Sequence, residues 1–125
     1  MITVFVYGTL MGNRANHRFY LKNQRYLGQA VLPGHALYDL GSFPGTIADP
    51  TEKVRGELYE INSQCLRQLD QLEGNGSLYV RETVMVRLGD EKREAQVYIW
   101  NGQIKAENKV AWADQPWTAG IRTRR

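Results

Sequence analysis

The first hydrophobic run of the chain is continuous rather than alternating. Positions 2–6 read ITVFV, and Tyr7 follows directly before the glycine at position 8. A strand with one exposed face carries apolar residues at every second position, whereas a strand buried on both faces reads as an unbroken apolar run. We therefore expect residues 2–6 to form a central strand that ends at Gly8. The mixed, mostly polar residues 9–24 predict a loop with a short helical turn.

Most of the remaining hydrophobic pattern is typical of strands. Runs rich in β-branched and aromatic residues recur between glycine, proline, asparagine and aspartate residues, which favour turns. The segment 41–50, GSFPGTIADP, predicts a loop with only a brief strand. The last two runs are joined by residues 89–92, GDEK, and predict a long hairpin. The strands expected after the first one are 26–32, 35–40, 53–61, 78–88 and 94–100.

One of these strands breaks the alternation. Within residues 53–61, Val54, Leu58 and Ile61 cannot all lie on one face when side chains alternate with a period of two. A glycine inside a strand often marks a bulge, where one extra residue shifts the alternation. We therefore expect a bulge at Gly56.

One segment carries a clear helical pattern. Asn62 or Ser63 can cap its first turn, and Gly74 can end it in a left-handed conformation. Between them the apolar residues follow helical spacing. These residues are Cys65, Leu66, Leu69 and Leu72.

About six strands and one clear helix indicate an α+β fold. We expect a small mixed, mostly antiparallel β-barrel with one or two helices packed outside it. A doubly wound parallel sheet is disfavoured because strands and helices do not alternate. The length of 125 residues predicts a single domain over residues 1–125. The residues after about 110 are weakly patterned and predict a loosely ordered tail, which Trp112 and Trp117 pack back onto the body.

Composition narrows the classes of function. The chain has 16 basic and 13 acidic residues and a net charge of +3, which is too mild to indicate a nucleic-acid partner. The basic residues Arg122, Arg124 and Arg125 predict a solvated end. A single cysteine excludes an intramolecular disulfide. Without a signal-peptide pattern or an apolar run of about 20 residues, we expect a cytoplasmic protein without a membrane partner.

The common catalytic motifs are missing. The only GxG triplet, at 74–76, follows a helix instead of preceding one, so it does not predict a phosphate-binding loop. His17 and His35 have no second metal ligand at a suitable spacing. Cys65 lies on the apolar stripe of the predicted helix and is expected to be a buried, inert thiol. Ser42, Ser63 and Ser77 lack the sequence context of a catalytic serine.

Two features remain candidates for chemistry. Tyr7-Gly8-Thr9-Leu10 is either a plain turn after a buried strand or a turn whose successive N–H groups hold an anion. Glu73 falls at the end of the predicted helix, where the helix dipole disfavours a carboxylate. It is either a solvated surface residue or a group whose raised pKa suits proton transfer near neutral pH.

Several blocks of sequence together resemble the gamma-glutamylcyclotransferase-like proteins, among them gamma-glutamylaminecyclotransferase and small bacterial relatives. The resemblance implies a small barrel with outer helices. It also implies cleavage of a γ-glutamyl amide or dipeptide by its own α-amine, releasing 5-oxoproline and an amine or amino acid without a cofactor. The matching blocks, in chain order, are VFVYGTLMGNRANH, LYDLGSFPGTI, VRGELYEI, LDQLEG with LYVRETV, and AQVYIW.

The same resemblance assigns roles to individual residues. It implies that Glu73 is the proton-transferring carboxylate, in preference to its neighbour in the motif, Glu82. It implies that the backbone of Tyr7, Gly8, Thr9 and Leu10 holds the α-carboxylate of the substrate. Further candidates for substrate binding are Tyr79, Arg81 and Tyr98.

Two other hypotheses remain open at this point. The same barrel could bind a small carboxylated metabolite without turning it over, or its surface could bind nucleic acid or protein. The mild net charge argues against nucleic acid. The sequence therefore favours a small γ-glutamyl compound as partner, and it leaves the leaving group and the oligomeric state open.

Overall fold

The structure is a computed structural model that describes residues 1–121; the predicted solvated end with Arg122, Arg124 and Arg125 lies outside these residues. Two short 3₁₀ helices, η1 (Ala106–Asn108) and η2 (Trp112–Asp114), follow the last strand. The main elements in chain order are β1 (Ile2–Val6), α1 (His17–Tyr20), β2 (Arg25–Asp39), β3 (Pro44–Ile61), α2 (Ser63–Glu73), β4 (Tyr79–Leu88) and β5 (Glu91–Trp100).

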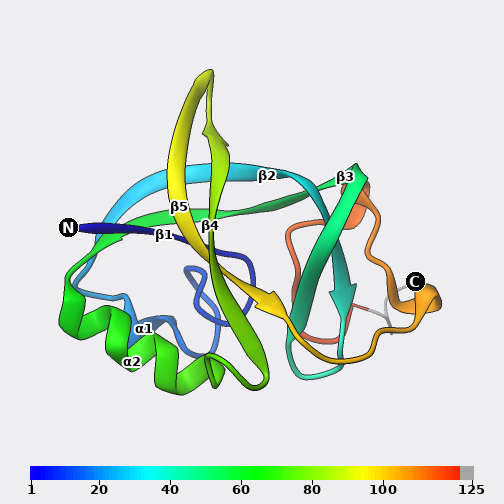
Figure 1. Ribbon diagram of the computed structural model, residues 1–125, viewed down its shortest axis with the longest axis horizontal. Coiled ribbons are helices and arrows are strands. Elements are labelled where there is room, and N and C mark those ends of the chain that lie inside the picture. Colours follow the sequence, from blue (N-terminus) through cyan, green and yellow to red (C-terminus); the bar gives the residue numbers. More distant parts are fainter. Residues whose placement is uncertain (122–125) are drawn as a thin grey trace.

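Within residues 1–121, five strands close into a small barrel in the order β1-β3-β2-β4-β5 (Figure 1). Neighbouring strands are antiparallel except β1 and β5, which run parallel. The closure is short, because β1 meets β5 only at Val4↔Gln96 and β2 meets β4 only at Val31↔Arg87. The predicted α+β fold, a mixed and mostly antiparallel barrel with helices outside, is confirmed.

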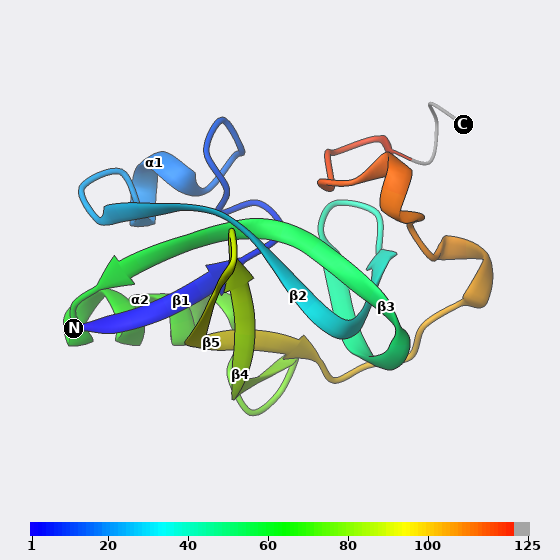
Figure 2. The same ribbon diagram turned by 90° about the horizontal axis from the view of Figure 1, so that it is seen from above.

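Strand β1 is buried on both faces, as its unbroken apolar run predicts. It lies between β3 and β5 in the barrel. Phe5 and Tyr7 belong to the apolar cluster inside the barrel, whereas Val4 and Val6 belong to a second cluster between the barrel and the helices. Both helices lie at one end of the molecule and the C-terminal segment lies at the other (Figure 2).

Strands β2 and β3 are longer than the sequence pattern predicts. The two expected strands 26–32 and 35–40 are one strand, with irregular pairing at Pro33/His35 and at Tyr26/Gly28. The brief strand expected within 41–50 is confirmed but is longer than expected, because all of Pro44–Ala48 pairs with the end of β2 and only residues 41–43 remain a loop. Proline and glycine in this segment suggested a loop, but the antiparallel ladder between the two strands keeps their backbones extended.

The bulge expected at Gly56 is not present. Gly56 pairs regularly with Ala30, and its missing side chain instead lets β3 approach β1: a Cβ at this position would lie 2.6 Å from Cζ of Phe5 and would also contact the Val6 carbonyl oxygen. Leu58 faces the barrel interior whereas Ile61 faces the helices, so the two need not share a face.

The local signals for the helix α2 are confirmed. The Asn62 side chain accepts a hydrogen bond from the Cys65 backbone N–H at 2.7 Å, and Gly74 ends the helix with φ 61°. The hairpin β4–β5 also forms, but its turn is only Gly89-Asp90, because Glu91 already begins β5.

The C-terminal segment is packed onto the barrel as far as Ile121. Val110, Trp117 and Ile121 are all buried in the cluster inside the barrel. The Trp117 indole donates to Asp39 at 2.9 Å. The expectation that Trp117 packs this segment back onto the body is confirmed.

Among residues 1–121, none of the helices has the length and apolar character that a membrane span requires.

Candidate active site

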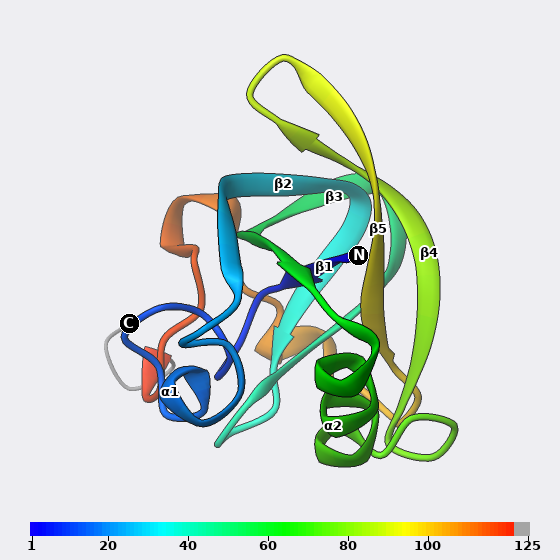
Figure 3. The same cartoon turned by 90° about the vertical axis from the view of Figure 1, so that its left-hand side faces the viewer.

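A cavity of about 360 Å³ opens where four segments meet. These are the turn after β1, the C-terminal end of α2, the start of β4 and the segment before β3, and α1 lies nearby at the same end of the barrel (Figure 3). A cavity of this size is typical of small-molecule sites. Of the predicted site residues it is lined by Tyr7, Gly8, Thr9, Leu10, Glu73, Tyr79 and Tyr98, and the pattern missed Asn16, Phe43, Pro44 and Leu78.

The turn after β1 keeps its carbonyl groups occupied and its N–H groups free. The carbonyls of Gly8 and Thr9 accept from later backbone N–H groups at 3.1 and 2.9 Å, and the Leu10 carbonyl contacts Nδ1 of His17 at 3.0 Å. Within residues 1–121 the N–H groups of Gly8, Thr9 and Leu10 donate to no protein acceptor. Consecutive free N–H groups in a turn can hold an anion.

Gly8 is required by a close approach rather than by an unusual backbone angle. A Cβ at this position would lie 2.8 Å from Cγ and Cδ of Pro44, which also lines the cavity. Any side chain here would push the turn and the Pro44 segment apart. The turn therefore depends on glycine for its packing against β3.

Glu73 is the last residue of α2, and its carboxylate belongs to the cavity. It makes no hydrogen bond or ion pair with any residue of the described part of the chain. Burial raises the pKa of this carboxyl from 4.5 to about 7. A carboxylate without a partner that titrates near neutral pH can both accept and return a proton.

Three tyrosines line the same cavity, and each of them donates its hydroxyl proton to a hydrogen bond within the protein. Tyr7 donates to the Tyr98 carbonyl at 2.5 Å, Tyr79 to the Pro44 carbonyl at 2.7 Å, and Tyr98 to Asp70 at 2.7 Å. Burial, with a smaller contribution from nearby negative charge, raises the pKa of all three phenols, so they stay neutral. Their oxygen lone pairs remain available to accept from a ligand.

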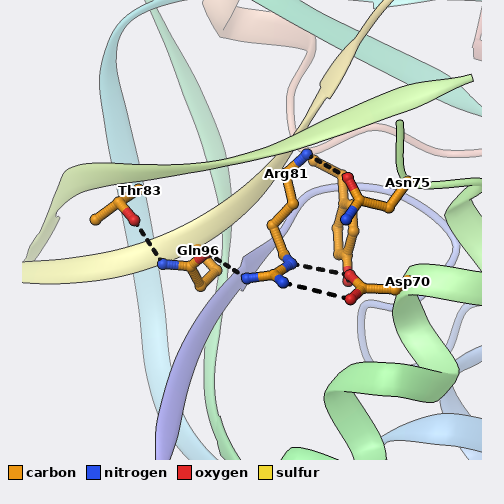
Figure 4. A network of polar contacts seen from close by, with 6 residues as sticks. Asp70, Asn75, Arg81, Thr83 and Gln96 are labelled. Carbon is orange, nitrogen blue, oxygen red and sulfur yellow. Dashed lines mark hydrogen bonds and ion pairs between the residues drawn. The ribbon is translucent and has the colours of Figure 1, made fainter. Parts of the chain in front are cut away.

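The side chain of Arg81 lies beside the cavity rather than in it. Its guanidinium binds the Asp70 carboxylate through Nε at 2.9 Å and Nη2 at 3.3 Å, and Nη1 donates to Gln96 at 2.7 Å (Figure 4). Asp70 is one helical turn before Glu73, so this network ties the end of α2 to β4 and β5. Sequence patterns gave no signal for Asp70, because its partners are distant in the chain.

We expect Arg81→Met to lower the free energy of unfolding by about 2 kcal/mol, because it leaves the partly buried Asp70 without its charged partner. The matched control is Arg93→Met, whose partner Glu91 is exposed on the hairpin and which should change stability by less than about 1 kcal/mol. Urea unfolding followed by circular dichroism measures both. Equal effects of the two substitutions would contradict this prediction.

Ser42, which lacks the sequence context of a catalytic serine, lines the cavity, whereas Cys65, His17 and Glu82 lie outside it. Cys65 is buried, and burial raises the pKa of its thiol, which suits an inert role. His17 supports the turn through Leu10, and Glu82 is exposed on β4. Within residues 1–121, no three His, Cys, Asp or Glu side chains are grouped so that they could hold a metal ion.

Comparison with known proteins agrees with this geometry. The model of one family, described as gamma-glutamyl cyclotransferase, AIG2-like, matches residues 4–119 of the chain. The protein belongs to this family. The match includes the turn after β1, α2 with Glu73, and the β4–β5 hairpin, so all parts of the cavity lie within the family domain.

Relatives from distant organisms share this domain. A Vibrio cholerae relative is 41% identical over 98 residues, 78% of this chain and 80% of that one. The gamma-glutamylaminecyclotransferase of Rattus norvegicus is 35% identical over 100 residues, 70% of this chain and 65% of that one. The crystal structure of an AIG2-like protein from Mus musculus superposes with a TM-score of 0.75 at 26% identity, covering 86% of this chain and 82% of that one.

Proposed function

We propose that this chain is a γ-glutamyl cyclotransferase that converts a γ-glutamyl amide into 5-oxoproline and a free amine. The observation that carries the proposal is one cavity that combines an unpaired carboxylate, Glu73, with the free N–H groups of the turn at residues 8–10. Membership of the family supports the reaction class. Neither a nucleophilic side chain nor a cofactor is needed, because the nucleophile is part of the substrate.

Binding would begin at the turn. The N–H groups of Gly8, Thr9 and Leu10 would donate to the α-carboxylate of the glutamyl group, because they have no protein acceptor within the described residues. The neighbouring α-ammonium would find acceptors in the Glu73 carboxylate and in the tyrosine hydroxyl oxygens that line the cavity. Both ends of the amino-acid head group would then be fixed.

The chemical step needs two protons to pass from the α-nitrogen to the leaving nitrogen, with Glu73 as their carrier. Glu73 would accept a proton from the α-ammonium, and the freed amine would attack the γ-carbonyl carbon to form the new C–N bond of the five-membered ring. The protonated Glu73 would then give its proton to the departing nitrogen as the old C–N bond breaks, and its carboxylate would take up the second proton, which the ring nitrogen loses. That proton passes to the released amine, which leaves as an ammonium and returns Glu73 to its carboxylate form. Holding the substrate in a folded conformation provides most of the rate acceleration, because ring closure is intramolecular. Backbone N–H groups near the turn would stabilise the negative charge that develops on the carbonyl oxygen.

The rim of the cavity suits an uncharged leaving group. Phe43 and Leu78 line it and are 38% and 53% exposed. Among the described residues that line the cavity, Glu73 is the only charged one, so a leaving amino acid would find no cation for its carboxylate. We therefore propose γ-glutamyl amines with apolar substituents as better substrates than γ-glutamyl dipeptides.

The deciding experiment measures 5-oxoproline release from a panel of γ-glutamyl alkylamines, γ-glutamyl aromatic amines and γ-glutamyl dipeptides. We expect release from the amines and slower release from the dipeptides. If no compound is cleaved while 5-oxoproline still raises the melting temperature, the chain is a binding protein and not an enzyme. If neither effect is seen, the proposed site itself is wrong.

We expect the rate to depend on pH through Glu73. Its pKa of about 7 means that the carboxyl is protonated, and unable to accept a proton, at lower pH. kcat/KM should therefore rise with pH up to about 7 and fall about tenfold per pH unit well below it. Initial rates between about pH 5 and about pH 9 test this. If the rate instead falls only below about pH 4.5, the ordinary pKa of a glutamate, burial does not raise the pKa of Glu73 in the working protein.

A further inference from the structure

A second cavity, of about 540 Å³, lies on the outer face of the barrel. It is lined by residues of β2, β3 and β4 and by the C-terminal segment around η2. It shares no lining residue with the cavity that holds Glu73. Its function is therefore a separate question, independent of the proposed reaction. The lining residues used below are Val31, Lys53, Arg55, Glu57, Arg87 and Trp112.

Strand register places two arginines in one row across this cavity. Val31 of β2 pairs with Arg55 of β3 on one side and with Arg87 of β4 on the other. Directly paired residues project from the same face of a sheet, so all three side chains share the outer face. Strands are about 4.8 Å apart, so the arginine backbones are about 10 Å apart with the short valine between them. Lys53, two residues before Arg55, adds a third cation on this face.

Among the described residues, these three cations have no carboxylate partner. The ion pairs within residues 1–121 are formed by Arg25, Arg81, Arg93 and Lys109, and none involves Lys53, Arg55 or Arg87. Among the described residues that line the cavity, Glu57 is the one acidic residue. Its carboxylate already accepts from the Gly12 N–H at 2.8 Å and from the Tyr59 hydroxyl at 3.0 Å. The cavity therefore carries an excess of positive charge.

The wall formed by the C-terminal segment is held in place. Gln115 accepts from the Arg55 N–H at 2.8 Å and donates to the Lys53 and Val110 carbonyls at 3.3 and 3.2 Å. The Trp112 ring lies under the Arg55 guanidinium at 3.6 Å and the Lys53 ammonium at 4.3 Å. Stacking on the ring restricts both cations, so less side-chain freedom is lost when a ligand binds.

We propose that this cavity binds a small multivalent anion, a metabolite that carries a phosphate group or several carboxylates. Arginine guanidinium groups bind phosphate and carboxylate through paired N–H donors, and two arginines line this cavity on either side of Val31. The volume fits a molecule of metabolite size and not a single chloride ion. The anion would replace the missing acidic partners of the row.

Isothermal titration with pyrophosphate and with citrate, at constant ionic strength, tests the proposal and distinguishes phosphate from carboxylate ligands. We expect saturable binding of at least one of them. The double variant Arg55→Gln/Arg87→Gln should bind at least about tenfold more weakly. The single variant Arg87→Gln changes only an exposed side chain and should weaken binding several-fold without affecting the fold.

The matched control is Arg18→Gln/Arg25→Gln, which has the same net charge but alters no residue of the cavity. Its affinity should equal that of the unchanged protein. An equal loss in both double variants would overturn the proposal, because binding would then follow net charge alone. Absence of binding by either anion would overturn it as well. Neither outcome bears on 5-oxoproline release, which depends on the other cavity.

Discussion

Glu73→Gln is expected to slow 5-oxoproline release by about 100- to 10,000-fold, the usual contribution of a general acid–base group. Glutamine has nearly the same shape as glutamate, so the cavity keeps its form, but it cannot accept a proton from the α-ammonium. Initial rates at pH 8 with a γ-glutamyl amine measure the effect. Turnover at the unchanged rate would mean that another group carries the proton.

A measurement of stability separates this chemical effect from a damaged fold. The pKa of Glu73 is raised from 4.5 to about 7, so the folded protein holds the extra proton more tightly than the unfolded chain does. The raised pKa therefore makes the fold less stable as pH rises between those two values, and the loss is complete above pH 7. Glutamine removes this loss, so the melting temperature of Glu73→Gln at pH 8 should equal or exceed that of the unchanged protein.

The matched control for the same assay is Glu82→Gln. Glu82 lies nine residues further along the same sequence block, but its side chain is exposed on β4 and does not line the cavity. We expect its rate to stay within about twofold of the unchanged protein, in keeping with a surface substitution. If Glu82→Gln loses a large part of the rate and Glu73→Gln does not, then Glu82 is the proton-transferring carboxylate.

Gly56→Ala is expected to lower the free energy of unfolding by about 3 kcal/mol, because the added methyl group has no room between β1 and β3. The added Cβ would lie 2.6 Å from Cζ of Phe5 and would also contact the Val6 carbonyl oxygen. Backbone atoms cannot rotate away, so β1 and β3 would have to separate. Thermal and urea unfolding measure the loss.

Gly12→Ala is the control for this substitution. A Cβ at Gly12 would meet only the Glu57 carboxylate oxygens, at 3.8 Å, which is an ordinary contact. Its stability should change by less than about 1 kcal/mol. If Gly56→Ala is tolerated equally well, β1 and β3 do not approach as closely as described. Because β1 leads directly into the turn at residues 7–10, Gly56→Ala should also weaken binding of 5-oxoproline.

The residues proposed to act in catalysis were predictable only as separate local patterns. The unbroken apolar run before Tyr7 and the helix end at Glu73 are local patterns. Only the resemblance of several sequence blocks, in order, to one family linked the two. Neither pattern contains the information that both segments line one cavity, because Glu73 lies 65 positions after Gly8 in the chain. Phe43 and Leu78 were missed for the same reason, since their place in the cavity depends on which segments meet and not on a local pattern.

Local sequence by itself determined the elements whose signals lie within a few residues. The Asn62 cap, the Gly74 end of α2 and the double burial of β1 follow from hydrogen-bonding capacity, backbone freedom and side-chain period. Tertiary structure alone decided which segments meet. It extended β3 through the proline- and glycine-rich residues 44–50, gave Gly56 a packing role, and paired Asp70 with Arg81. The physical reason is that strand pairing, close approach and ion pairing depend on partners distant in the chain, which no local pattern identifies.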